Sequence, residues 1–307
     1  MKYPLLETLA AIFLLLLVAS AIGFVLRLSK GPENTTIRNL NQRIVSWWWI
    51  IAVVGAALLC GAYATILLFM ICGFVAFREF ITLTPTRPAD YWPLVFAFYV
   101  VLPGQFLFVA LHWYGMVAIF IPVYAVFGLS AAAALGADTE AFLERTGKLN
   151  WAVLVCIYGV SYAPALLMLG TPAHAGAPLL LFLLVVVQAS DVFQYVCGKL
   201  FGHTLLAPRV SPSKTVEGLL GGGACAVLIG MALHGLTPFG FWQAAPMSLA
   251  IVVGGFIGGL VLSAVKRSLG AKDWGTMLAG HGGMLDRIDS ICFAAPLFFH
   301  LTRYFFS

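Results

Sequence analysis

Charged residues are scarce in this sequence. Only 9% of its 307 residues are Asp, Glu, Lys or Arg, whereas 62% are hydrophobic, and the mean hydropathy is +0.99. A soluble domain carries about 25% charged residues because its surface faces water. So few charges cannot cover a water-soluble particle of this length. The composition therefore excludes an ordinary soluble protein and indicates an integral membrane protein.

Cysteine and histidine are also sparse, with six of each. The cysteines lie within apolar runs, without a CxxC pair or a histidine at zinc-site spacing, so we interpret them as small core residues. Basic residues exceed acidic ones by only 17 to 12, and no basic cluster is interleaved with aromatic residues. This pattern argues against nucleic-acid binding and favours a basic face that meets membrane lipids and a phosphorylated ligand.

Long hydrophobic runs, by contrast, fill most of the chain. Because a helix needs about 20 apolar residues to cross a membrane, they predict an all-α, polytopic membrane protein with about ten transmembrane helices. The apolar run 47–77 is too long for one crossing and is divided at Gly61. The first run is expected to be a retained span and not a signal peptide. The expected spans are residues 5–26, 47–61, 63–78, 92–110, 114–136, 151–170, 178–198, 216–235, 246–266 and 288–306.

The distribution of Lys and Arg predicts the orientation of these spans. If both termini lie outside, only Lys2 and Arg303 fall on the outer side. Cytoplasmic connections of membrane proteins carry an excess of basic residues, so we expect the basic connections between these spans to face the cytoplasm. We divide the chain into N-terminal helices, 1–150, and a C-terminal membrane region, 151–307. The expected cytoplasmic connections are residues 27–46, 79–91, 137–150, 199–215 and 267–287.

Asp191 lies inside a predicted span, directly after a long apolar run. A carboxylate there costs on the order of 3 kcal/mol on insertion scales, so it normally faces a polar cavity or a partner. This favours a functional role. The alternative is a helix-packing hydrogen bond with Gln188, Ser190 or Gln194.

The segment 208–218 leads directly into another span. Ser213 or Thr215 can cap the new helix, and Glu217 can complete a capping box. The free N–H groups of such a helix start attract phosphate, and Lys214 and Arg209 add positive charge. The alternative is a capped helix whose lysine and arginine only mark the cytoplasmic side.

The segment 263–289 is the richest in polar residues. Ser263, Lys266 and Arg267 are spaced to share one helical face, and so are Asp286 and Asp289. Two carboxylates facing one way repel unless a cation lies between them, and oxygen ligands beside phosphate suit Mg²⁺. The alternative is that a neighbouring arginine simply neutralises the acids.

Together these segments resemble the signature of the phosphatidate cytidylyltransferase (CDP-diacylglycerol synthase) family, over residues 191–289. Gly282 and Gly283 of that signature also permit close backbone approach to a ligand. The residues that carry the resemblance are Asp191-x3-Tyr195-x2-Gly198-Lys199; Ser211-Pro212-Ser213-Lys214-Thr215-x-Glu217-Gly218; Ser263-x2-Lys266-Arg267-x4-Lys272-Asp273; and Gly280-His281-Gly282-Gly283-x2-Asp286-Arg287-x-Asp289.

The resemblance implies transfer of a cytidylyl group from CTP to phosphatidic acid, which yields CDP-diacylglycerol and pyrophosphate in phospholipid biosynthesis. It implies Mg²⁺ held by Asp286 and Asp289, and a homodimer. It also implies that residues 151–307 are the catalytic region, with the active site facing the cytoplasm of a bacterial cytoplasmic membrane. The catalytic residues it implies are Lys266, Arg267, Lys272, Asp273 and His281. The substrate-binding residues it implies are Asp191, Tyr195, Lys199, Arg209, Ser211, Ser213, Lys214, Thr215, Glu217, Ser263, Gly282, Gly283 and Arg287.

The sequence departs from that family at Gly259, where the family usually carries an aspartate one helical turn before Ser263. Trp274 is a milder departure, because the family commonly has a small residue there. The loss of a carboxylate leaves two alternatives to the phosphatidate enzyme open. One is a paralogue that acts on another lipid phosphate, and the other is a membrane protein that binds lipid phosphate or nucleotide with impaired catalysis.

Overall fold

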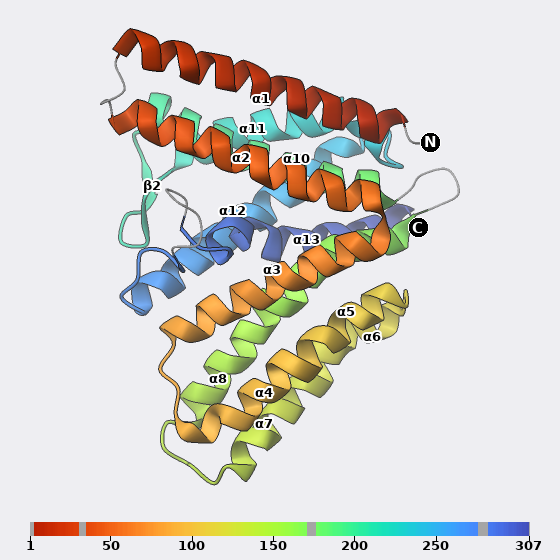
Figure 1. Ribbon diagram of the computed structural model, residues 1–307, viewed down its shortest axis with the longest axis vertical. Coiled ribbons are helices and arrows are strands. Elements are labelled where there is room, and N and C mark those ends of the chain that lie inside the picture. Colours follow the sequence, from red (N-terminus) through yellow and green to blue (C-terminus); the bar gives the residue numbers. More distant parts are fainter. Residues whose placement is uncertain (1–2, 31–34, 171–175, 276–281, 307) are drawn as a thin grey trace.

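The computed structural model describes residues 3–30, 35–170, 176–275 and 282–306, which are almost entirely helical (Figure 1). The predicted all-α, polytopic membrane fold is confirmed. Among the described residues, seven helices are long and apolar enough to cross a membrane. These seven are residues 5–27, 62–83, 88–110, 114–135, 142–169, 176–201 and 244–268.

The described residues form ten helical rods, one at each predicted span. Three rods contain a wide π-helical turn, at residues 97–101, 120–125 and 154–159. The predicted boundary at residue 150 lies inside α8 (Phe142–Val153), which continues into α9 (Val160–Ala165). In chain order the helices are α1 (Tyr3–Lys30), α2 (Thr35–Cys60), α3 (Ala62–Leu83), α4 (Tyr91–Phe96) continuing into α5 (Leu102–Ala110), α6 (Tyr114–Ile119) into α7 (Val126–Leu135), α8 (Phe142–Val153) into α9 (Val160–Ala165), α10 (Gly176–Phe201), α11 (Val216–Ala232), α12 (Ala244–Ser268) and α13 (Leu285–Phe306).

The division of the long apolar run at Gly61 is confirmed. Helix α2 ends at Cys60 and α3 begins at Ala62, and the φ of Gly61 is 107°, a backbone conformation that favours glycine. Helix α2 starts at Thr35, well before the predicted span at residue 47. The difference arises because hydropathy locates the apolar part of a helix, whereas backbone hydrogen bonding continues into its polar end.

Helix α3 and the α8–α9 rod lie at the centre of the molecule (Figure 1). On one side they meet α4–α5 and α6–α7, and on the other α9 packs against α13. Helices α10, α11, α12 and α13 pack on one another in sequence. Fully buried side chains such as Phe77, Tyr162 and Phe298 belong to one continuous core that joins the two halves.

Glycines bring α12 and α13 into close contact, as small residues one turn apart commonly do between membrane helices. A Cβ atom added at Gly258 would lie 2.6 Å from the backbone oxygen of Asp289, and one at Gly254 would lie 3.0 Å from the Cα of Ala294. Side chains at these glycines would separate the two helices. The approach therefore places the polar ends of α12 and α13 beside each other.

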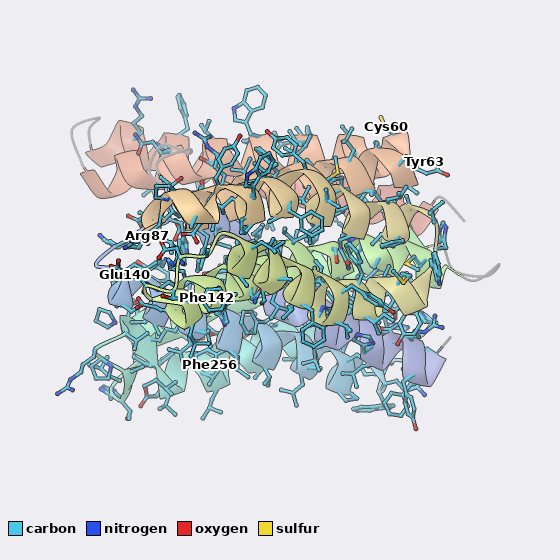
Figure 2. The ribbon with its side chains drawn as sticks, turned by 90° about the horizontal axis from the view of Figure 1, so that it is seen from below. Cys60, Tyr63, Arg87, Glu140, Phe142 and Phe256 are labelled. Carbon is cyan, nitrogen blue, oxygen red and sulfur yellow. The ribbon has the colours of Figure 1, made fainter. Side chains whose placement is uncertain are left out.

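Both chain ends lie at one end of the helical bundle, opposite the hairpin that contains β2 (Figure 1). The hairpin pairs β1 (Leu205–Ala207) with β2 (Ser211–Thr215) in antiparallel register and was not anticipated from the sequence. Arg87 and Glu140 lie at one end of the bundle, away from Cys60 at the other (Figure 2). Arg87 bridges Asp138 and Glu140 there, at 2.8 and 2.7 Å.

Candidate active site

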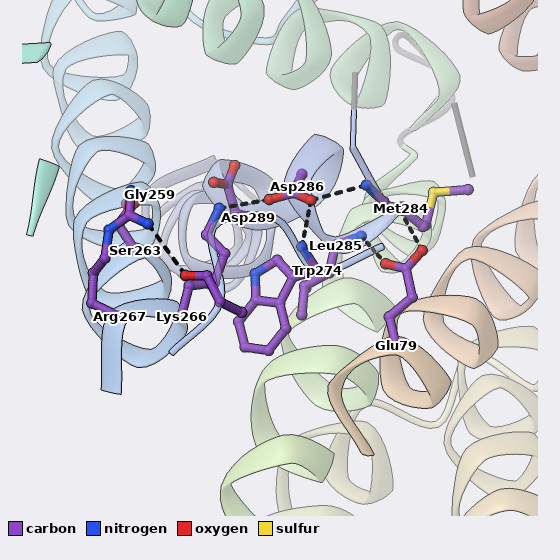
Figure 3. Close-up of polar contacts among 12 residues, drawn as sticks. Glu79, Gly259, Ser263, Lys266, Arg267, Trp274, Met284, Leu285, Asp286 and Asp289 are labelled. Carbon is purple, nitrogen blue, oxygen red and sulfur yellow. Dashed lines mark hydrogen bonds and ion pairs between the residues drawn. The ribbon is translucent and has the colours of Figure 1, made fainter. Parts of the chain in front are cut away.

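The last turn of α12 and the first turn of α13 are joined by a buried ion pair (Figure 3). The Nζ atom of Lys266 lies 2.6 Å from Oδ1 of Asp286, and both side chains are about nine-tenths buried. The other oxygen of Asp286 accepts the backbone N–H groups of Trp274 at 2.8 Å and Gly283 at 2.9 Å. Asp286 therefore fixes both Lys266 and the segment between the helices. At Gly282, φ is +75°, and an added Cβ would lie 2.6 Å from this carboxylate.

A second pair of carboxylates faces this ion pair from α10 and α13. The buried hydroxyl of Ser290 donates to Asp191, at 3.1 Å from Oδ2, and the backbone N–H of Ser290 donates to Oδ1 of Asp289 at 2.7 Å. Asp191 and Asp289 are close enough to repel each other electrostatically. Asp191 itself remains exposed. Its observed partner is Ser290 of α13, whereas the helix-packing alternative named Gln188, Ser190 or Gln194. The functional role of Asp191 stays a prediction.

Lys214, at the end of β2, extends its ammonium group towards these acids. Its Nζ atom lies 3.4 Å from the backbone oxygen of Phe256 and 4.7 Å from the centre of the Phe256 ring. Burial lowers the pKa of Lys214, although Asp289 and Asp191 act in the opposite direction. A Cβ added at Gly259 would lie 2.9 Å from this Nζ atom and 3.8 Å from Oδ2 of Asp289. The departure at position 259 therefore faces the site, and Lys214 lies beside it.

The start of α11 is capped as predicted, but without a capping box. The Thr215 hydroxyl accepts the N–H of Gly218 at 3.0 Å. Glu217 occupies the second position of α11 and accepts the backbone N–H groups of His203 and Thr204, each at 3.1 Å. The capping-box prediction is wrong because Glu217 stands one position too early. Its carboxylate instead anchors the turn that follows α10.

The remaining predicted residues surround this centre. Ser263 donates to the backbone oxygen of Gly259 at 2.6 Å, and Arg267 donates to the backbone oxygen of Val210 at 3.3 Å, which joins α12 to the hairpin. Lys199 lies 6.0 Å from the centre of the Tyr195 ring on the exposed side of α10. Arg209, Ser213, Lys272 and Asp273 are exposed, Ser211 and Arg287 are partly buried, and Gly283 is buried. His281 lies outside the described residues.

The acidic residues of the site fit a magnesium ion in part. Among the described residues there is no group of three or more His, Cys, Asp or Glu side chains placed to hold a metal. Mg²⁺ commonly takes one or two carboxylates and completes its shell with water and substrate phosphate. Asp191 and Asp289 provide two repelling carboxylates of that kind. Both oxygens of Asp286 are already bonded, to Lys266 and to two N–H groups.

Glu79 of α3 is a site residue that sequence reasoning missed. Its carboxylate accepts the backbone N–H groups of Met284 at 2.8 Å and Leu285 at 2.9 Å, at the start of α13 (Figure 3). In the sequence Glu79 follows Arg78 at the end of an apolar run, as interfacial charges commonly do. No local signal distinguishes it from them.

Comparison with known proteins shows which family the chain belongs to. The chain matches the sequence profile of the cytidylyltransferase family over residues 41–305. It is 35% identical over 303 residues to the uncharacterized protein YnbB of Escherichia coli (strain K12). That alignment covers 97% of this chain and 98% of YnbB. It is also similar to phosphatidate cytidylyltransferases of Brucella abortus biovar 1 (strain 9-941), 38% identical over 156 residues, and Staphylococcus saprophyticus, 35% identical over 145 residues.

The chain belongs to the cytidylyltransferase family and is therefore a membrane-embedded nucleotidyltransferase. The resemblance inferred from the sequence motifs is confirmed at this level. The matches to the two phosphatidate cytidylyltransferases cover 50% and 46% of this chain and 57% and 56% of those enzymes. The chain thus spans little more than half of their length.

Proposed function

We propose that this protein transfers the cytidylyl group of CTP to phosphatidic acid at the cytoplasmic face of a bacterial cell membrane. A phosphate oxygen of the lipid attacks the α-phosphorus of CTP. The bond from that phosphorus to the bridging oxygen of the β-phosphate breaks, and pyrophosphate leaves. The product is CDP-diacylglycerol, a precursor for phospholipid biosynthesis.

The convergence of Lys214, Lys266, Asp191 and Asp289 at one end of the bundle carries this proposal. Four separate elements, β2, α12, α10 and α13, contribute these charges, and Lys214 interacts electrostatically with each of the other three groups. Nucleotidyl transfer requires the negative charge of the triphosphate to be neutralised and the reacting groups to be held in line. Two lysines, together with a cation held by the two acids, would meet the first requirement.

The residues of the site have different tasks in this proposal. Lys214 and Lys266 bind the phosphates of CTP, and the exposed Lys272 and Arg209 reach groups that approach from the water phase. Mg²⁺, held by Asp289 with Asp191 beside it, neutralises charge on the triphosphate when bound. Asp286 holds Lys266 in place, so a metal ligand role for Asp286 would require that ion pair to separate. A homodimer completes the proposal.

The decisive experiment incubates the purified protein with labelled CTP, phosphatidic acid and Mg²⁺ and then identifies the labelled lipid. Labelled CDP-diacylglycerol is the expected product. Parallel reactions with lysophosphatidic acid and with a polyprenyl phosphate test other lipid-phosphate acceptors. Product from one of those lipids alone would replace phosphatidic acid as the substrate. Absence of product from all of them would contradict the proposal of an active enzyme.

A further inference from the structure

The end of α3 holds the start of α13, although the two are distant in the sequence. Glu79 accepts the N–H groups of Met284 and Leu285 through its two carboxylate oxygens (Figure 3). These N–H groups lie at the beginning of the helix whose first two turns carry Asp286 and Asp289. A carboxylate is favoured there because the N-terminus of a helix bears partial positive charge and unpaired N–H groups.

Two glycines enclose the Glu79 carboxylate. A Cβ added at Gly275 would lie 2.8 Å from Oε1 of Glu79, and one at Gly283 would lie 2.5 Å from Oε2. A side chain at either position would push the carboxylate away from its N–H partners. Gly275 and Gly283 therefore leave room for this one side chain from the N-terminal half of the molecule.

The residue next to Glu79 makes a second, independent contact with the same segment. The ring of Phe80 stacks on Trp274, with 5.1 Å between ring centres and 23° between planes, and Trp274 is only 2% exposed. The N–H of Trp274 donates to Asp286, which in turn pairs with Lys266. The last turns of α3 thus contact Trp274, which follows α12, as well as Met284 and Leu285 at the start of α13.

We propose that Glu79 is a positioning residue for nucleotidyl transfer. It holds the first turn of α13 so that Asp289 and the Lys266–Asp286 pair face the nucleotide, without touching substrate itself. Because Glu79 occupies the N–H groups that open α13, phosphate binding falls to the lysines instead. This inference rests on the proposed function, because the groups that Glu79 positions are those assigned to CTP.

The test compares Glu79→Gln, Glu79→Ala, Gly275→Ala and the double variant of Glu79→Ala with Gly275→Ala. Glu144→Gln is the matched control, since Glu144 is exposed and pairs only with Lys148 on the surface among the described contacts. For each purified protein, kcat and KM for CTP, the unfolding temperature in detergent, and the rise of that temperature with CTP and Mg²⁺ are measured.

We expect Glu79→Gln to lower kcat/KM for CTP by about tenfold with only a small fall in unfolding temperature, because one N–H group loses its acceptor but misplaced groups reduce rate more than they reduce folding. Glu79→Ala lowers it further, since glutamine still offers one acceptor oxygen. Gly275→Ala alone lowers kcat/KM, because the added Cβ clashes with the Glu79 carboxylate. In the double variant it lowers kcat/KM little further, because Glu79→Ala has removed that carboxylate. Wild-type kinetics in Glu79→Gln, or additive losses in the double variant, would overturn the inference.

The two proposals fail in different ways. If the wild-type protein forms no CDP-diacylglycerol, the acceptor assigned above is wrong, and the CTP-dependent rise in unfolding temperature becomes the readout for Glu79. A smaller rise in Glu79→Gln than in Glu144→Gln supports the positioning role, and an equal rise overturns it. A wild-type protein that CTP does not stabilise at all would overturn both proposals.

Discussion

The ammonium group of Lys214 lies in the space that a side chain at position 259 would enter. In the phosphatidate cytidylyltransferases that the sequence motifs resemble, position 259 usually carries an aspartate. Here the flexible end of a lysine from β2 lies there instead, close to Asp289 and to the backbone of Phe256. A positive charge therefore lies where that carboxylate would lie, so the site has one negative charge fewer beside Asp289.

Gly259→Asp should reduce the affinity for CTP. The new carboxylate would pair with Lys214 and withdraw it from phosphate, so we expect the KM for CTP to rise by roughly tenfold, equivalent to one charge-assisted hydrogen bond. Gly259→Ala is the control, because it adds the Cβ atom without charge. Steady-state kinetics across a Mg²⁺ titration measure both. Higher turnover with a lower Mg²⁺ requirement would instead mean that the missing carboxylate limits metal binding.

Asp289→Asn should abolish turnover while the protein stays folded. The change removes a charge that we propose faces phosphate and metal but also relieves repulsion with Asp191, so we expect kcat to fall by about 100-fold or more at an unchanged unfolding temperature. Enzyme assays at limiting Mg²⁺ and thermal unfolding in detergent provide the measurement. Wild-type turnover in this variant would remove Asp289 from the site.

Asp286→Asn should behave differently, because Asp286 is half of a buried ion pair. Leaving Lys266 without its partner costs about 3–5 kcal/mol, so the unfolding temperature falls together with turnover. The same two measurements as for Asp289→Asn distinguish the two aspartates. Equal stability of the two variants would contradict the separate roles that we assign to them.

At the scale of elements, the contact between α12 and α13 sets the geometry of the site. Gly258→Val would place a side chain against the backbone of Asp289, and overpacking of this kind costs about 1–3 kcal/mol. We expect a lower unfolding temperature and a loss of turnover. The control is Gly147→Ala in α8, where an added Cβ meets no atom within 4 Å. That substitution should leave stability equal or slightly higher, because alanine favours a helix.

At the scale of the whole molecule, the fold separates a polar end that carries the site from an end that carries both termini. A membrane-impermeant maleimide should therefore label cysteines introduced at Thr86 and Pro208 from one side only, and a cysteine at Tyr304 from the other. All three positions are exposed. A variant in which the exposed Cys60 is replaced serves as the background. Labelling of Thr86 and Pro208 from opposite sides would contradict the shared polar end.

The positions of the helices could be predicted from the sequence because each depends on a local property. An apolar run long enough to cross a membrane forms a helix wherever it stands, and Gly61 divides two of them by its own backbone freedom. The residues of the C-terminal site were predictable for a similar reason, since their motifs lie within short segments. Thr215 capping α11 is one such local outcome.

Contacts between distant segments were decided by the tertiary structure alone. Glu79 meets the start of α13 across more than 200 residues, and its sequence context is that of an ordinary interfacial acid. Likewise, the sequence spacing placed Asp286 and Asp289 on one helical face. It could not show that Lys266 pairs with Asp286 or that Asp191 lies near Asp289. Which charges meet depends on how closely α10, α12 and α13 approach, and only the packed helices define that distance.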